Sequence, residues 1–309
     1  MHKDKFWLLV TLFGIISHTG FTQDFSNKGK DFWIGYGNHV RMFNSQSPDQ
    51  MQVYITSDVN TNGYVDIPGI GFHTSFSVTA NQITTVNIPR TAALTDEGVF
   101  NTGIHIVSDL PVVVYSFIYV NAISGATVCL PTNVLGREYY SVNYTQISND
   151  PDSYSWFFVV ATEDSTLVEI TPVARTRGGK AGNVPFTVSL NKGQIYQVLG
   201  EATSKTTGAD LTGSFIRSVN TGSGCKRIAV FCGSGKISIG CSNTPRTSDN
   251  LYQEIYPKSS WGKKYVTTPS TNDGANYQVN FYRIIRPDTS TIVKLNGAVI
   301  PPGSFINNF

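Results

Sequence analysis

Apolar and polar positions alternate with a period of two along almost the whole chain. The expected strands include residues 51–56, 84–88, 111–119 and 157–161, and they are rich in Val, Ile, Thr, Tyr and Phe. This period places alternate side chains on opposite faces of a pleated strand, and these residue types favour strands. Gly, Asn, Asp and Pro separate the segments, as in sandwiches and barrels. The pattern therefore predicts an all-β fold.

Three segments share one plan of strand, acidic turn and strand. They read QVYITSDVNTNGYVDIP from Gln52, FVVATEDSTLVEITP from Phe158 and YRIIRPDTSTIVKLN from Tyr282. Further matches keep their order in the first two copies, among them LPTNVLGREYY with YPKSSWGKKYV. Such self-similarity predicts tandem β-sandwich-like repeats. We expect an N-terminal strand segment at 23–45, repeats at 46–146 and 147–270, and a partial, truncated third repeat at 271–309.

The N-terminal residues predict export. Lys3 and Lys5 precede an apolar run from Phe6 to Ile16, and small and polar residues follow. This is the layout of a signal peptide at 1–22, cleaved after Thr22. The alternative is a membrane anchor, but the apolar run has about 11 residues and a span needs roughly 20. The mature chain is therefore expected to be secreted or held at the cell surface.

Composition excludes several classes of partner. Charged residues make up 14% of the chain, the net charge is +2, and no basic run occurs, so a nucleic-acid partner is not expected. Four cysteines are too few for a disulfide-built scaffold, and no CxxC pair indicates zinc. Cys225 and Cys241 flank an expected hairpin of residues 226–231 and 236–240, which predicts a disulfide between them. Cys129 and Cys232 are expected to be buried thiols.

Two motifs imitate ligand-binding loops. Residues 58–66 match several positions of a calcium loop, but Gly69 stands where a glutamate should close the site. Residues 233–236 (GSGK) resemble a phosphate-binding loop, but Ile237 replaces the required Ser or Thr. Hairpin turns explain both motifs better, and no metal or cofactor is predicted.

Candidate catalytic residues also have simpler explanations. The predicted mature chain has three histidines, His39, His73 and His105, and no local catalytic signature accompanies them. Paired carboxylates of a glycosidase leave no sequence signature. However, the candidate acids recur at one position of each repeat, as turn residues do; they are Asp58, Asp164 and Asp288. The sequence predicts no catalytic residue.

Exposed aromatic pairs could stack on sugars. The candidates are Phe32, Trp33, Tyr139, Tyr140, Trp261 and Tyr265. Core packing is the preferred interpretation, because Tyr139 and Tyr265 stand at equivalent repeat positions.

Several long segments resemble one known family. GKDFWIGYG (29–37), LPTNVLGREYY (130–140), LNKGQIYQV (190–198) and DNLYQEIYPKSSWGKKY (249–265) are similar to the N-terminal domain of the IgG Fc-binding protein family. That family includes an animal mucus protein and large secreted proteins of Bacteroidota, many of them gliding-associated or exported by type IX secretion. Cys232 and Ser248 depart from the family's usual residues. The resemblance implies an extracellular binding module.

The sequence therefore predicts an adhesion or binding module for a protein or glycoprotein outside the cell. The alternatives are a glycan-active enzyme with paired carboxylates and a structural stalk of a larger surface protein. Three connections are longer in the second repeat, at 173–184, 202–210 and 242–248. Since loops vary without disturbing a core and arginine suits gripping a partner, Arg175, Arg177 and Arg246 are the predicted binding residues.

Overall fold

The computed structural model describes residues 26–40, 50–120, 123–219, 222, 224–239, 248–267, 282–286, 288 and 290–301. These residues form twenty strands and four 3-10 turns, and no α-helix occurs among them. The all-β prediction is confirmed. The described part of the chain contains no helix long and apolar enough to cross a lipid bilayer.

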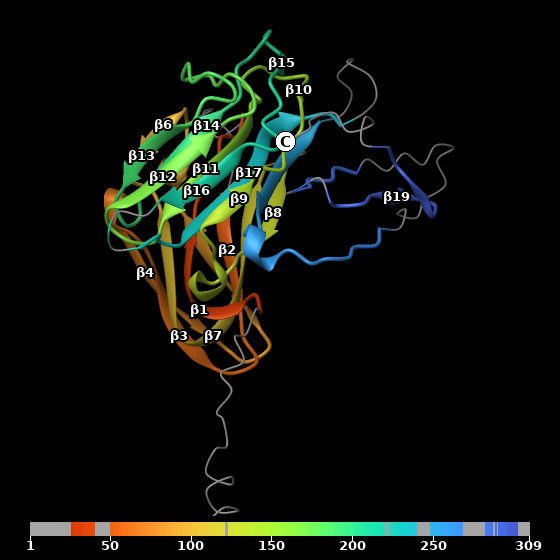
Figure 1. Cartoon of the computed structure of the whole chain (residues 1–309). Coiled ribbons are helices and arrows are strands. Elements are labelled where there is room, and N and C mark those ends of the chain that lie inside the picture. The colour runs from red at the N-terminus through yellow and green to blue at the C-terminus, as the bar shows by residue number, and fades with distance from the viewer. Residues whose placement is uncertain are drawn as a thin grey trace, which may run out of the picture.

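The first part of the chain forms a seven-stranded antiparallel sheet, at the bottom of Figure 1. Its order is β4-β3-β7-β2-β5, and β1 and β8 also pair with the long strand β7. The strands are β1 (Lys28–Ile34), β2 (Gln50–Thr56), β3 (Thr61–Ile67), β4 (Phe72–Val78), β5 (Ile83–Ile88), β7 (Ile104–Tyr119) and β8 (Gly125–Val128).

The second part contributes a central sheet and an outer sheet, both antiparallel. The central sheet has the order β18-β17-β11-β14-β6, with β6 (Gly98–Phe100), β11 (Ser155–Ala161), β14 (Ile195–Leu199), β17 (Ile228–Ile237) and β18 (Asp249–Glu254). The outer sheet has the order β13-β12-β16-β9, with β9 (Glu138–Tyr140), β12 (Thr166–Thr171), β13 (Phe186–Leu190) and β16 (Phe215–Val219).

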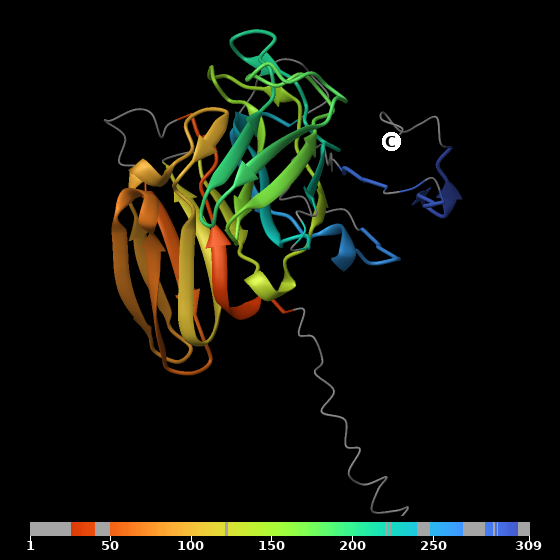
Figure 2. The same ribbon diagram turned by 60° about the vertical axis from the view of Figure 1, so that its left-hand side comes forward.

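The remaining elements are short. Two small ladders join β10 (Gln146–Ile147) with β15 (Thr207–Gly208), and β19 (Lys294–Leu295) with β20 (Ala298–Val299). The 3-10 turns are η1 (Pro68–Ile70), η2 (Arg90–Ala92), η3 (Thr132–Val134) and η4 (Lys258–Ser260). The β19–β20 hairpin belongs to the segment with the third copy's sequence and lies to one side of the sheets (Figure 2).

The central sheet is buried on both faces. Every residue of β11, β14 and β17 is buried, because alternate side chains enter two different cores. Phe158 and Phe231 pack with residues of the seven-stranded sheet. Phe157 and Val159 pack with residues of the outer sheet. The molecule is therefore three layers of β-structure around two adjoining cores.

The two parts share one strand order. In the first, β8, β7, β2 and β5 are neighbours in that order, and in the second β18, β17, β11 and β14 are. Likewise β4, β3, β7 and β1 correspond to β13, β12, β16 and β9. The first part differs in one strand. The single long strand β7 pairs with β3 in its first half and with β2 in its second half, whereas the second part uses two separate strands, β16 and β17, in these places. β6 and β9 lie within the predicted first repeat, 46–146, but they pair with strands of the second part. The repeat boundaries at 46, 146 and 270 stay a prediction.

The expected hairpin at residues 226–240 is wrong. β17 is one continuous strand, and the GSGK motif lies inside it, so that motif is neither a turn nor a phosphate loop. The glycine serves close packing instead: a Cβ on Gly233 would lie 1.9 Å from the Leu251 carbonyl oxygen. The hairpin was the reason for pairing Cys225 with Cys241. Cys241 is outside the described residues, so that disulfide remains a prediction.

Other expectations have mixed outcomes. Cys129 and Cys232 are buried free thiols. Tyr139 is buried, whereas Tyr265 is 72% exposed, so its assignment to a core was wrong. Gly136 and Gly262 stand at the same position of the matching segments LPTNVLGREYY and YPKSSWGKKYV. Their N–H groups both donate to the hydroxyl of the tyrosine three residues later, at 2.8 and 2.5 Å. The predicted signal peptide at 1–22 lies outside the described residues.

Candidate functional site

The long connections of the second part lie side by side. Residue Thr176, in the 173–184 loop, forms a β-bridge with Gly200. The Glu201 N–H donates to the Arg175 carbonyl at 3.0 Å, and the Arg177 N–H donates to the Leu199 carbonyl at 2.8 Å. These backbone hydrogen bonds fix the 173–184 loop against the start of the next connection. The loop is therefore ordered before any partner binds.

Arg177 is held by two residues from other parts of the chain, Asp96 and Tyr154. Its Nε donates to Asp96 Oδ1 at 2.9 Å, its Nη1 donates to the Tyr154 hydroxyl, and the guanidinium lies 4.9 Å from the centre of the Tyr154 ring. The hydrogen bond with Asp96 raises the pKa of Arg177 above its usual value. Partial burial raises the pKa of Asp96, but the hydrogen bonds from Arg177 and Glu97 outweigh it and leave this pKa below the usual value. The side chain of Arg177 remains 44% exposed.

Arg175 is the more accessible of the two arginines. Its Nε donates to Glu201 Oε1 at 2.9 Å, and its side chain is 59% exposed. Surface ion pairs of this kind contribute little to stability and exchange readily with a partner's groups. The structure thus brings Arg175 and Arg177 into one loop. Arg246, the third predicted binding residue, lies outside the described residues.

The neighbouring 202–210 loop contacts the segment that carries the third copy's sequence. Arg283 Nη1 pairs with Asp210 Oδ2 at 2.5 Å, and the guanidinium lies 4.1 Å from the centre of the Tyr144 ring. Thr145 also donates to Asp210, at 3.2 Å. Both long connections of the second part are therefore tied to other elements by arginine contacts.

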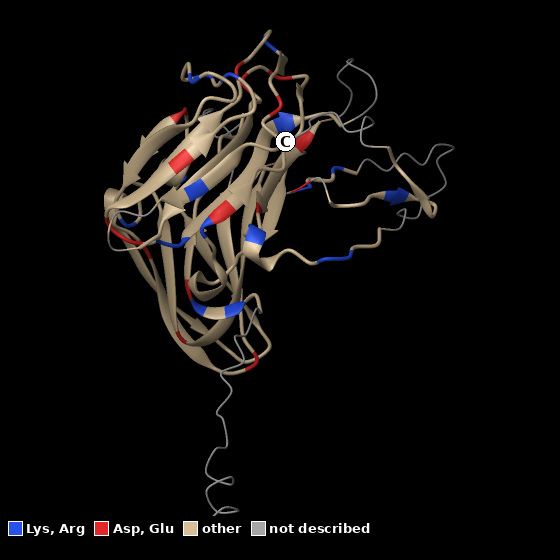
Figure 3. Cartoon of the chain, viewed as in Figure 1, with Lys and Arg blue, Asp and Glu red and all other residues tan. Residues whose placement is uncertain are grey.

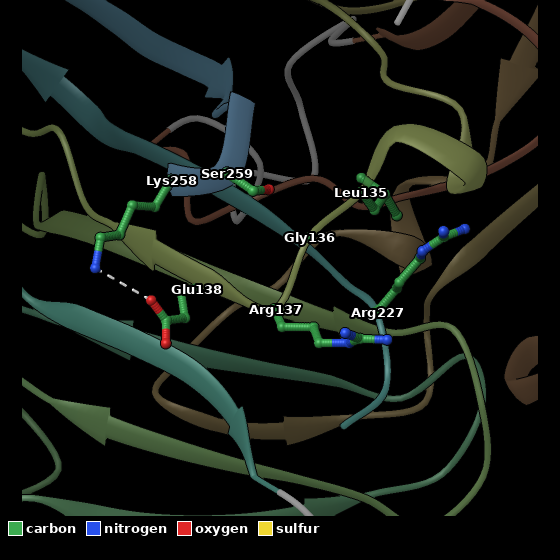
Figure 4. Close-up of a pocket in the computed structure, with 7 residues that line it drawn as sticks. All are labelled: Leu135, Gly136, Arg137, Glu138, Arg227, Lys258 and Ser259. Carbon is green, nitrogen blue, oxygen red and sulfur yellow. Dashed lines mark hydrogen bonds and ion pairs between the residues drawn. The ribbon is translucent and has the colours of Figure 1, made fainter. Parts of the chain in front are cut away.

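A positively charged pocket opens between β9, β17 and η4. Its volume is about 530 Å³, and Figure 4 shows its lining residues, which are Leu135, Gly136, Arg137, Glu138, Arg227, Lys258 and Ser259. Lys258 pairs with Glu138 at 3.3 Å, and Arg227 donates to the Thr132 carbonyl at 3.5 Å. Two arginines and a lysine outnumber the single acid, so the pocket suits an anionic group such as a carboxylate or a sulfate.

Sequence reasoning missed this pocket because its walls come from distant segments. Residues 135–138, 227 and 258–259 meet only in the fold. Gly136 makes the meeting possible, since a Cβ there would lie 2.2 Å from the Pro257 Cβ. The same contact occurs earlier, where a Cβ on Gly29 would lie 2.2 Å from the Pro131 Cβ. The pairs Gly29–Pro131 and Gly136–Pro257 repeat the same close contact, and this repetition was the signal in the sequence that could have located the pocket.

Charges on the outer sheet mostly pair with each other. Arg217 on β16 lies between Glu169 on β12 and Glu138 on β9 in the strand register, and its Nε donates to Glu169 at 2.8 Å. Figure 3 shows these charges as a row across the outer sheet. Because they are paired at the surface, they form a solvated face.

The candidate catalytic groups have structural contacts. His105 Nε2 lies 2.6 Å from Asp31 Oδ2, and its ring stacks on Trp33 with 4.1 Å between ring centres. Asp58 pairs with Lys28 at 2.5 Å, and Asp164 accepts the Lys192 N–H at 3.0 Å in a turn. Within the described ranges, no cluster of three or more His, Cys, Asp or Glu side chains could hold a metal ion.

The comparison with protein families gives one match. The model of the IgGFc binding protein family matches residues 125–308, more than half of the chain. The chain belongs to this family. The matched span contains the 173–184 and 202–210 loops and the pocket, whereas β1 to β7 precede it. None of the curated proteins and none of the solved structures compared with the chain is similar to it.

Membership places the chain in a family named for protein binding. The most specific sequence segments, LPTNVLGREYY and DNLYQEIYPKSSWGKKY, both lie within the matched span. The GKDFWIGYG segment lies before it. The resemblance predicted from the residues is therefore confirmed for the part of the chain from β8 onward.

Proposed function

We propose that this chain is a secreted or cell-surface module that binds a protein or glycoprotein without catalysis. The binding surface is formed by residues 173–184, which carry Arg175 and Arg177, and residues 202–210, whose Asp210 pairs with Arg283; we call these two segments the arginine loops. Family membership supports a protein ligand. The observation that carries the assignment to these loops is their internal order, since Arg175 and Arg177 are exposed yet held by hydrogen bonds. An ordered loop loses less conformational entropy on binding.

The family's name makes the Fc fragment of immunoglobulin G the first ligand to test, with purified mucin as the second. The alternatives remain a glycan-active enzyme and a structural stalk. The pocket of Figure 4 has one acid, Glu138, paired with Lys258, and thus offers no second carboxylate for glycoside hydrolysis.

The experiment measures binding of the mature chain to Fc and to mucin by surface plasmon resonance. Arg175→Ala and deletion of residues 178–182 should each weaken binding about ten-fold or more, because arginine anchors often dominate an interface. Arg217→Ala is the matched control, since Arg217 also pairs with a glutamate and is 45% exposed but lies on the outer sheet. The melting temperature should stay nearly unchanged in all variants. Unaltered affinity in both loop variants would exclude these loops.

A further inference from the structure

The seven-stranded sheet has an outward face whose counterpart in the second part is covered. There, the side of the central sheet that carries Phe158 and Ile195 lies under the chain after β1: a Cβ on Gly35 would lie 2.6 Å from Ile195 Cδ1. The Asn38 N–H also donates to Gln197 on this side, at 2.8 Å. The protein's own backbone therefore occupies this face in the second part.

The matching face of the first part is open among the described residues. It consists of the outward positions of β2, β5, β7 and β8, which we call the aromatic face. Tyr119 is 50% exposed and Tyr115 is 39% exposed, whereas the alternating positions of the same strands, such as Val53 and Val114, are buried. No described segment covers it as residues 33–40 cover the central sheet.

Four aromatic rings form a row on this face. Tyr54 lies opposite Tyr115 in the strand register. The Tyr54 and Phe117 rings stack with 5.7 Å between centres, and Phe117 and Tyr119 lie 6.1 Å apart. Neighbouring rings are inclined by about 30°, and the exposed rings of Tyr115 and Tyr119 add apolar surface on the solvent side of the sheet.

Amide side chains border the rings. The Gln52 amide donates to Gln50 at 3.0 Å and to Asn87 at 2.8 Å, and the Tyr54 hydroxyl donates to Gln52 at 2.8 Å. The side-chain amide NH2 groups of Gln50 and Asn87 have no protein acceptor among the described residues, so they can donate to a ligand. The outward positions of β2, β5 and β8, and those of β7 from Val113 to Tyr119, carry no charge.

We propose that the aromatic face binds an uncharged oligosaccharide. A sugar ring offers an apolar C–H face that packs on an aromatic ring and a rim of hydroxyl groups that pair with amides. Lys28 of β1 lies opposite Val113 at the edge of this face, but its ammonium group is already paired with Asp58, so the described part of the face favours an uncharged ligand. A protein segment is less suited, because Gln52 and Tyr54 stand on the open face at the repeat positions that Phe158 and Val160 hold on the covered face. This surface is separate from the arginine loops, so each proposal can fail alone.

The test applies neutral and sialylated oligosaccharides released from mucin to the mature chain, with affinity measured by calorimetry. Neutral oligosaccharides should bind, and Tyr115→Ala and Tyr54→Ala should each weaken binding about ten-fold, the loss expected when a stacked ring is removed. Tyr256→Ala is the matched control, because Tyr256 is 55% exposed but lies after β18. It should bind as the unchanged chain does.

Three outcomes would overturn the proposal. The first is absence of binding to any neutral oligosaccharide, or unchanged binding in both face variants. The second is a concentration-dependent dimer that Tyr115→Ala abolishes, which would make the face an interface between two copies. The third is binding of deglycosylated protein that Tyr115→Ala abolishes, which would make the occupant a polypeptide. Variants of the arginine loops should lose Fc or mucin-protein binding without any change in their affinity for neutral oligosaccharides.

Discussion

Glu254 is a carboxyl group buried between the first and second parts of the molecule. The Leu130 N–H donates to its Oε2 at 2.7 Å, while Oε1 has no hydrogen-bond partner within the described part of the chain. Burial raises the pKa of Glu254 well above its usual value of 4.5. Burial, together with the nearby Glu254, also raises the pKa of the Cys129 thiol. Glu254 is therefore protonated in the folded protein under conditions where the unfolded chain is ionised.

This residue predicts a pH-dependent stability. Above the usual pKa the unfolded chain releases a proton that the folded protein keeps, so the free energy of unfolding falls as pH rises. Glu254→Gln removes this loss and should melt at a higher temperature than the unchanged chain at about pH 8, with a smaller difference near about pH 4. Calorimetric melting over this pH range measures the difference.

The control is Glu163→Gln, which changes an exposed glutamate in a turn. Its melting temperature should follow that of the unchanged chain. A Glu254→Gln variant that melts at the same temperature as the unchanged chain across the whole pH range would show that the buried carboxyl does not carry this pH dependence.

At the level of elements, strand positions could be read from the sequence and strand environments only in part. Alternation located β2, β3 and β5, because each has one buried and one exposed face. The SWFFVVA run of β11 lacks alternation, and it is buried on both faces. Such a run indicates two-sided burial. The continuation of β17 through Gly233 could not be predicted, since a glycine required by close packing and a glycine required by a turn look alike in the sequence.

The same limit applies to the sites. Arg175 and Arg177 could be selected because long connections with arginine are recognisable along the chain. Their partners Asp96 and Tyr154 could not, since they are far from the loop in sequence. The aromatic face was also missed: the rings of Tyr54 and Tyr115 become neighbours only through strand pairing, and the exposed aromatics considered from sequence were others.

At the scale of the whole molecule, the two parts are joined by a shared core. Trp156 on β11 donates its indole N–H to the Asn38 carbonyl at 2.8 Å, and Tyr252 on β18 lies 2.7 Å from the Ser116 hydroxyl. Both side chains belong to the core cluster of the seven-stranded sheet. Separating the parts would expose the apolar side of the central sheet to water, at a cost of about 25 cal/mol per Å².

The chain is therefore expected to unfold in one cooperative calorimetric transition. The ratio of calorimetric to van't Hoff enthalpy should be close to one, which is the criterion for a single unit. A chain whose repeats fold separately would instead show two transitions, or one broad transition with a ratio near two. Trp156→Ala should lower the melting temperature of the whole molecule rather than of one part.

The most direct test of the binding function measures what the mature chain does to a ligand. Incubation with immunoglobulin Fc, mucin and serum glycoproteins, followed by plasmon resonance and by mass spectrometry of the recovered ligands, reports binding and cleavage together. A binding module should bind at least one of these ligands saturably and reversibly, and every ligand should be recovered with its mass unchanged. Turnover of a glycan or peptide bond would contradict this prediction, and so would the absence of binding to all of them.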